Sequence, residues 1–135
     1  MIQVESLTKR YGSRVAVDHL TFHANKGEIV GFLGPNGAGK TTTMRILTGY
    51  MPATAGTAKV AGFDIFSQTM KVKEQIGYLP ENPPLYLDMT VHGYLDFVGK
   101  LRGMKKARRK ERIAWVIEKC NLQAVADRLI ENLSK

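Results

Sequence analysis

A glycine-rich loop constrains this chain more than any other feature of its sequence. The loop has the pattern G-x-x-x-x-G-K-[S/T], present as Gly34, Pro35, Asn36, Gly37, Ala38, Gly39, Lys40 and Thr41. Glycines lack a Cβ, so the backbone can curl and point successive N–H groups inward at an anion. An apolar run at residues 28–33 precedes the loop and a helical pattern follows it, which is the context that a phosphate-binding loop needs. The loop therefore predicts a site for nucleotide phosphates.

Individual residues of the loop are expected to take different parts in binding. Lys40 supplies a positive charge that reaches the β- and γ-phosphates, and the Thr41 hydroxyl takes a coordination position on Mg²⁺. A helix that begins near Gly39 directs its positive end at the same place. Thr42 completes the set of residues expected to contact the nucleotide. The loop alone does not distinguish a GTPase, a kinase and an ATPase.

Charge is unevenly distributed along the 135 residues. The formal net charge is +8, and one run of seven cations opposed only by Glu111 contains Arg102, Lys105, Lys106, Arg108, Arg109, Lys110 and Arg112. Two interpretations stay open for this run: a solvated helix face, or a contact with acidic lipid headgroups or an acidic partner. No aromatic residue suited to stacking bases lies within it, so nucleic acid is not an expected partner. A single cysteine excludes an internal disulfide.

Hydrophobic periodicity divides the chain into a mixed part and a helical part. Strands are predicted at residues 2–8, 14–22, 28–33, 57–61 and 76–79, the first as an edge strand and the third buried on both faces of a sheet. Helices are predicted at residues 41–50, at 67–73 with Ser67 as a cap, from Thr90 as N-cap to residue 101, from 104 to about 120, and at 123–129. About the first eighty residues thus mix strands with helix, and the rest is helical.

The residues around the loop resemble the start of an ATP-binding-cassette (ABC) ATPase. The resemblance covers LTKRYGSRVAVDHLTFHANKGEIVGFLGPNGAGKTTTMRILTG and extends to TAGTAKVAGFDI, which is similar to a strand pair of that family. It implies that Tyr11, 23 positions before Gly34, stacks on adenine. In IGYLPENPPLY, Glu81 stands where the family normally has the glutamine that meets Mg²⁺ and the attacking water. A carboxylate can also coordinate Mg²⁺, so Lys40 and Glu81 are the expected catalytic residues, and Thr41 and Glu81 the expected metal ligands.

The resemblance also implies a fold class and a division into domains. The fold is α/β, a P-loop NTPase of the ABC ATPase type with an antiparallel β-subdomain and an α-helical subdomain. Residues 1–86 would form the ATP-binding core with the β-subdomain, and residues 87–135 the helical subdomain up to the start of the signature motif. The combination of LPEN with a signature that begins Leu133, Ser134, Lys135 is similar to exporter-type (ABC-2) members, including gliding-motility transporters.

Several motifs of the family do not occur in these 135 residues. Beyond Leu-Ser-Lys the family continues its signature, and it then has the Walker B strand with a magnesium-binding Asp and a catalytic Glu; no apolar run of four ending in Asp-Glu is present. The chain is therefore interpreted as an N-terminal fragment that lacks the Walker B half, binds nucleotide and does not hydrolyse it efficiently. The alternatives are a non-transport ABC protein that acts on ribosomes or DNA, a module that only binds nucleotide, and a P-loop kinase or GTPase outside the family.

For the full-length protein, the resemblance implies an ATPase subunit that couples ATP binding and hydrolysis to transport through a separate membrane partner. The expected cofactors are ATP and Mg²⁺. The expected partners are a second ABC ATPase subunit, which completes a dimer, and a transmembrane permease that docks on the helical subdomain. Such a subunit would be cytoplasmic and peripheral on the inner face of the cell membrane.

Overall fold

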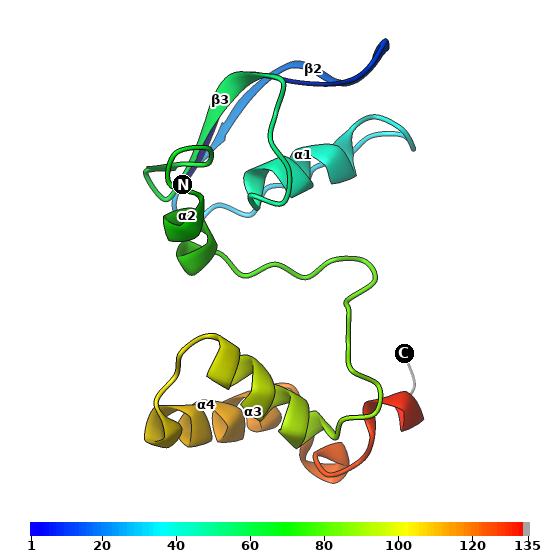
Figure 1. Ribbon diagram of the computed structural model, residues 1–135, viewed down its shortest axis with the longest axis vertical. Helices are drawn as coiled ribbons and strands as arrows, with labels where there is room; N and C mark the ends of the chain where they lie inside the picture. Colours follow the sequence, from blue (N-terminus) through cyan, green and yellow to red (C-terminus); the bar gives the residue numbers. More distant parts are fainter. Residues whose placement is uncertain (134–135) are drawn as a thin grey trace. The chain divides into compact units, whose positions relative to one another are not determined.

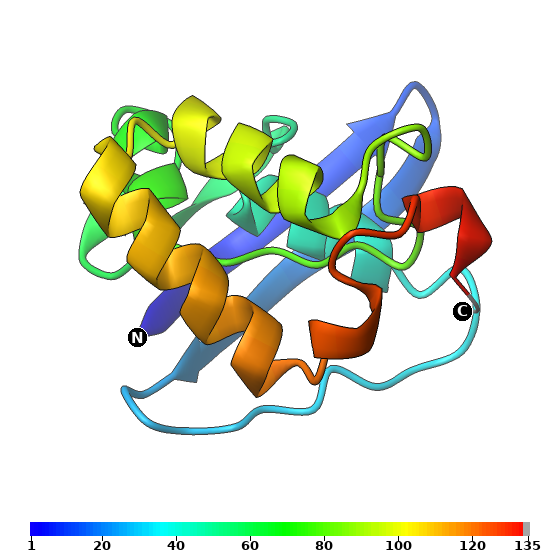
Figure 2. The ribbon, with the colours of Figure 1, turned by 90° about the horizontal axis from the view of Figure 1, so that it is seen from below.

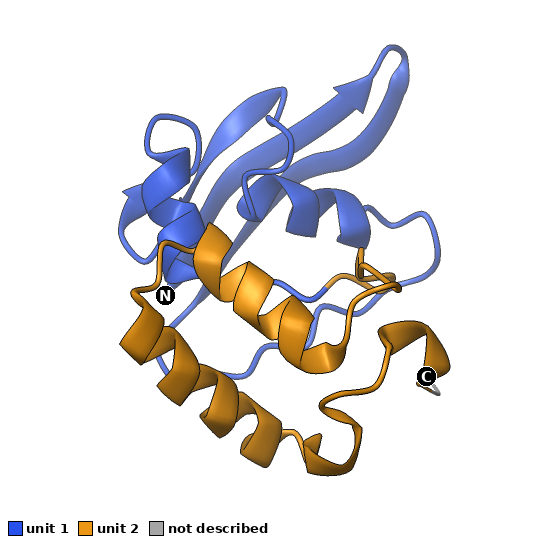
Figure 3. Ribbon diagram, turned by 60° about the horizontal axis from the view of Figure 1, so that its bottom comes forward, with its two compact units in different colours: residues 1–79 blue, residues 80–135 orange. Residues whose placement is uncertain are grey.

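A computed structural model describes residues 1–133 of the chain. The chain divides into two compact units after Leu79: unit 1 spans Met1–Leu79 and unit 2 spans Pro80–Lys135 (Figure 3). All strands belong to unit 1, and the two longest helices belong to unit 2. The domain boundary expected between residues 86 and 87 stays a prediction.

Unit 1 contains an antiparallel sheet with the strand order β2-β1-β3-β4 (Figure 1). The strands are β1 (Ile2–Tyr11), β2 (Arg14–Ala24), β3 (Ala55–Val60) and β4 (Phe63–Asp64). β1 pairs with β2 on one side and with β3 on the other, so the prediction of an edge strand at residues 2–8 is wrong. Irregular register with β2 between Val4 and Lys9, and a positive φ at Ser6, interrupt the alternation of apolar and polar residues. Because such bulges weaken the alternation of apolar and polar residues, this central strand has the sequence pattern of an edge strand.

Two short helices complete unit 1 and supply part of its core. They are α1 (Lys40–Leu47) and α2 (Thr69–Gln75). The core comprises Val4, Leu7, Ala58 and Val60 of the sheet, Ile46 and Leu47 of α1, Val72 of α2, and Ile65 between β4 and α2. Ser67 does not cap α2 with its side chain, contrary to the sequence prediction. Its hydroxyl instead donates to the Asp64 carboxylate at 2.9 Å, and that carboxylate also accepts the N–H groups of Phe66 and Ser67.

Two predicted strands, at residues 28–33 and 76–79, do not form. In the described residues every strand pairs within the one antiparallel sheet, so neither segment has a hydrogen-bonding neighbour. An extended segment without a neighbour is not stabilised as a strand. Ile29 is fully exposed and Leu33 is 93% exposed, contrary to the prediction of burial on both faces. Only Phe32 is covered, with its ring centroid 5.7 Å from that of Phe22.

Unit 2 is built on an antiparallel pair of helices, α3 (Val91–Leu101) and α4 (Lys106–Lys119), which lie side by side (Figure 2). The Thr90 cap is confirmed, since its hydroxyl accepts the N–H of Gly93 at 3.0 Å. Two 3₁₀ turns follow, η1 (Gln123–Val125) and η2 (Ile130–Asn132), so the predicted helix at 123–129 is reduced to one short turn. Leu101, the last residue of α3, is 71% exposed.

An ion-pair cluster joins α3 to α4. The Asp96 carboxylate accepts from Lys100 Nζ at 2.7 Å and from Arg109 Nε at 2.5 Å. The aliphatic stem of Arg109 lies against Gly99, where a Cβ would come within 2.6 Å of it. The hydrogen bond from Lys100 and that from Arg109 together lower the pKa of Asp96 to about 2.

The cluster predicts a pH dependence for unit 2. Because the pKa of Asp96 is lower in the folded chain, the carboxylate contributes stability above its ordinary pKa of 3.8, and this contribution is lost as the pH falls through about 2. We expect Asp96→Asn to reduce the thermal midpoint of helix unfolding near neutral pH. The reduction should shrink when the same melts are recorded by circular dichroism near pH 2. Asp127→Asn, which removes an exposed carboxylate, is the control; an Asp96→Asn deficit that does not change with pH would contradict the prediction.

Candidate functional site

The glycine-rich loop lies in unit 1 and leads directly into α1. Gly39 is the N-cap of α1, with φ at +84° in the left-handed region. A Cβ on Gly39 would lie 2.3 Å from the carbonyl oxygen of Ala16 and 3.1 Å from Cγ2 of Val17, both in β2. Glycine is therefore required at this position by its backbone conformation and by the approach of β2. Both requirements fix where the first turn of α1 begins.

Lys40 closes the loop on itself. Its ammonium group donates to the carbonyl oxygen of Gly34 at 2.5 Å and to that of Pro35 at 2.7 Å. The N–H of Ala38 donates to Pro35 O at 3.2 Å and tightens the same turn. An ammonium group has three donors, so one donor of Lys40 is left for an anion. The lysine is thus held over the loop by two of the loop's own carbonyl groups.

The start of α1 provides further groups for an anion. The first N–H groups of a helix have no acceptor within the helix, and its dipole makes this end positive. The first turn of α1 contains no acidic residue that would compete for these groups. Thr41 is exposed and Thr42 is half-buried, whereas Thr43 faces the core. The Thr41 hydroxyl is therefore accessible to a metal ion bound beside the loop.

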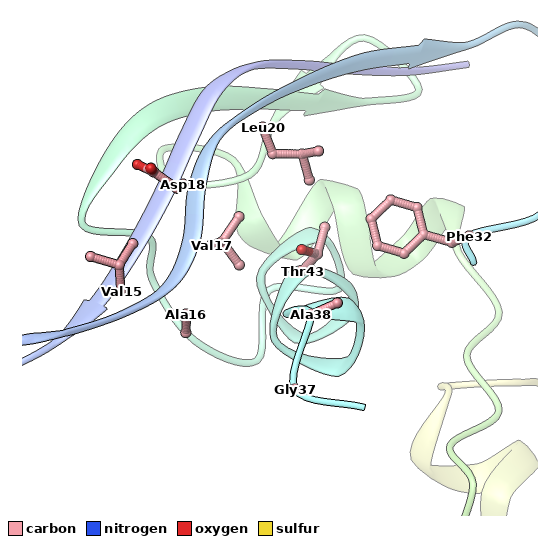
Figure 4. A pocket seen from close by; sticks show the side chains of 9 residues that line it. All are labelled: Val15, Ala16, Val17, Asp18, Leu20, Phe32, Gly37, Ala38 and Thr43. Carbon is pink, nitrogen blue, oxygen red and sulfur yellow. The ribbon is translucent and has the colours of Figure 1, made fainter. Parts of the chain in front are cut away.

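Residues of β2, the loop and α1 line a cavity of about 420 Å³. Figure 4 shows its walls: strand residues on one side, and Phe32, Gly37, Ala38 and Thr43 on the other. The strand side is formed by Val15, Ala16, Val17, Asp18 and Leu20. The sequence did not predict that β2 contributes to this cavity, because residues 14–22 have only the apolar pattern of a strand. Gly39 was the sequence feature that could have indicated this contribution, because a glycine is often required where another backbone segment comes close.

Tyr11 lies at the end of β1, in the hairpin with β2. Its ring is 48% exposed, its hydroxyl donates to Met51 Sδ at 3.2 Å, and the Lys9 ammonium lies 5.3 Å from its ring centroid. Tyr11 is not among the residues that line the cavity beside the loop. Its contact with adenine stays a prediction.

Glu81 belongs to unit 2 and is exposed. It lines a cavity of about 840 Å³ together with residues that include Pro83, Leu87 and Ile130. Within residues 1–133 no group of three or more His, Cys, Asp or Glu side chains is placed to hold a metal ion. Mg²⁺ is commonly held by one or two protein oxygens together with substrate phosphates, so the roles of Thr41 and Glu81 stay predictions. None of the helices in this part of the chain is long and apolar enough to cross a membrane.

A glycine-rich loop that is closed by its lysine and followed at once by a helix has the form of a P-loop. The start of α1 and the close approach of β2 at Gly39 fix the conformation of this loop. Comparison with known families then identifies the group to which the domain belongs. The sequence model of the ABC transporter family matches residues 17–135, so the chain is a member of this family.

Similar proteins are ATP-binding components of transporters from diverse organisms. The chain is 40% identical to the linearmycin resistance ATP-binding protein LnrL of Bacillus subtilis over 134 residues, which is 99% of this chain and 43% of LnrL. It is 37% identical to the Nod factor export ATP-binding protein I of Ralstonia nicotianae, of which it covers 42%. A solved structure of the ATP-binding subunit of an ABC transporter superposes with a TM-score of 0.86 at 26% identity, and the match covers all of this chain and 56% of that one. The chain thus spans less than half the length of these two curated relatives, and the α/β fold of the ABC ATPase type is confirmed.

Proposed function

We propose that the chain is the phosphate-binding part of an ABC transporter ATPase subunit and that residues 34–41 hold the phosphates of Mg²⁺-ATP. The observation that carries the proposal is the position of Lys40, which is bound to two loop carbonyls and retains one donor. The loop is therefore arranged for an anion in advance, and little conformational freedom is lost when a phosphate binds.

The chain's own residues divide the work of binding. The third N–H of Lys40 and the free N–H groups at the start of α1 donate to β- and γ-phosphate oxygens. The hydroxyl of Thr41 would hold Mg²⁺, which would neutralise phosphate charge when bound. The family resemblance assigns a further role as Mg²⁺ ligand to Glu81, which lies in unit 2. Tyr11 offers its ring face to adenine. Pro35, Asn36, Gly37 and Ala38 supply the loop backbone between Gly34 and Gly39, which would surround the phosphates.

The proposal is tested by titrating the chain with Mg²⁺-ATP in a calorimeter. Lys40→Ala removes a charged donor, and such hydrogen bonds contribute about 1.5–3 kcal/mol, so affinity is expected to fall about 10- to 100-fold. Lys26→Ala removes an exposed lysine from the turn after β2 and is expected to leave affinity unchanged. Equal affinities for the parent chain and Lys40→Ala, with both folded by circular dichroism, would refute the proposed site.

We further propose that these 135 residues bind ATP without efficient turnover, because they include no Walker B strand and no general base beside it. Phosphate release is expected to match that of buffer containing Mg²⁺-ATP alone. The measurement is a phosphate-release assay on the parent chain and on Lys40→Ala. A rate above that of buffer that disappears in Lys40→Ala would contradict the proposal.

In the full-length protein we propose two partners, a second ATPase subunit and a transmembrane permease. Relatives described as resistance and export ATP-binding proteins support this role. The helical subdomain, residues 87–135, would dock on the permease, and residues 1–86 would form the ATP-binding core with the β-subdomain. The subunit would then be cytoplasmic and would lie against the inner face of the cell membrane.

A further inference from the structure

One face of α4 carries a line of cations with a tryptophan between them. The residues are Lys105, which is the N-cap of α4, and Arg108, Arg112, Trp115 and Lys119 within the helix, and we call them the basic stripe. Their spacings of three, four, three and four residues place them on one side of a helix. Ile113, the buried residue of α4, follows Arg112, which is half-buried, and points about 100° away from it around the helix. The stripe therefore lies beside the face of α4 that packs on α3.

Most of the positive charge of the stripe is not neutralised within the described part of the chain. Arg108 pairs with Glu111 at 2.9 Å. Arg112 lies over the Trp115 ring, with its guanidinium carbon 4.2 Å from the ring centroid. Among residues 1–133, Lys105 and Lys119 form no ion pair. Arg109, by contrast, is held by Asp96 and is a structural residue. The stripe thus presents a net positive surface, which is complementary to an acidic partner.

Exposed apolar side chains accompany this charge. Trp115 is 46% exposed within the stripe, Leu101 at the end of α3 is 71% exposed, and Met104 in the turn before α4 is 37% exposed. Tryptophan and basic residues that share a helix face are typical of helices that lie in a membrane interface, where the ring and the lysine stems enter the headgroup layer and the charges meet phosphates.

We propose that the basic stripe binds the surface of a membrane that contains anionic lipids. A straight helix of 14 residues presents a line of cations that a flat lipid surface can meet all along its length. Nucleic acid fits less well, because Arg112 covers a face of the one tryptophan that would have to stack on a base. This lipid contact would add to the membrane location that we propose above, and it does not depend on nucleotide binding.

The test uses Trp115 as the probe, since it is the only tryptophan in the chain. Its fluorescence is recorded while the 135-residue chain is titrated with vesicles of phosphatidylcholine, with or without added phosphatidylglycerol. We expect a shift of emission to shorter wavelength and protection from iodide quenching with the anionic vesicles alone, and both should weaken as salt is raised. Each cation near an anionic surface contributes about fivefold to binding, so Lys105→Gln, Arg112→Gln and Lys119→Gln together should weaken binding about 100-fold.

Two further variants make the result specific. Arg10→Gln, Arg14→Gln and Lys26→Gln together remove the same charge from exposed positions of unit 1 and should leave binding nearly unchanged. Glu111→Gln frees Arg108 and should strengthen binding about fivefold, a gain that misfolding does not produce.

The proposal is overturned by equal binding to neutral and anionic vesicles, by equal losses in the stripe and control variants, or by a Trp115 response to an acidic polypeptide or oligonucleotide without one to vesicles. Because the titration contains no nucleotide, its failure would leave the proposed ATP site standing. Failure of the Lys40→Ala test would in turn leave the basic stripe standing.

Discussion

Gly39→Ala is expected to abolish measurable ATP binding and to lower the free energy of unfolding of unit 1 by about 3 kcal/mol or more. The left-handed conformation alone costs an alanine about 1–2 kcal/mol. The new Cβ would also lie 2.3 Å from the carbonyl oxygen of Ala16, a backbone atom that moves only if β2 moves. Relief of this contact requires either displacement of β2 or displacement of the loop, and either change disrupts the arrangement around Lys40.

A second glycine of the same loop is a matched control for this prediction. Gly37 has φ at +86°, close to that of Gly39, but a Cβ there would have nothing within 4 Å. Gly37→Ala therefore carries only the conformational cost of about 1–2 kcal/mol. Denaturant unfolding of the two variants measures how much stability is lost through the contact with β2 and how much through the backbone conformation. Equal losses of stability would show that the approach of β2 does not matter.

The second large effect concerns residues 28–33, where an apolar segment lies in solvent. Ile29 and Leu33 are almost completely exposed, and the backbone there pairs with no strand of the described residues. Extended apolar segments with free N–H and C=O groups tend to pair with another chain. We expect the 135-residue chain to form dimers or larger species as its concentration rises, as measured by sedimentation velocity.

Charge on this segment should prevent the association. Ile29→Lys with Leu33→Lys is expected to restore a monomer at concentrations where the parent chain associates. Phe66→Lys with Met70→Lys places the same charges on other exposed apolar positions and should not do so. A parent chain that sediments as a monomer at every concentration would contradict this prediction.

The conformation of the glycine-rich loop could be predicted from the sequence because it depends on neighbouring residues. Gly34, Gly39 and Lys40 are neighbours in the chain, and their spacing determines a turn, a helix start and a charge without reference to distant residues. The Thr90 cap could be predicted for the same reason. The contribution of Ala16 and Val17 could not, since it depends on how β2 crosses behind Gly39.

The strand predictions failed where pairing decided the outcome. Residues 28–33 have the apolar composition of a buried parallel strand, but a strand forms only when neighbours accept its hydrogen bonds. Residues 2–8 have weak alternation, yet β1 is central because β2 and β3 both pair with it. The composition of a segment shows whether it could form a strand, whereas the place of that strand in a sheet depends on which strands are present to pair with it.

Hydrogen exchange of the loop amides, followed by mass spectrometry, tests most directly whether residues 34–41 bind phosphates. The chain is compared alone, with Mg²⁺-ATP, and with adenosine, which has the base and sugar but no phosphates. We predict that ATP slows exchange in peptides covering residues 34–41, that adenosine does not, and that Lys40→Ala removes the effect. Unchanged exchange in the loop with saturating ATP, or equal protection by adenosine, would contradict the assignment of this loop as the phosphate site.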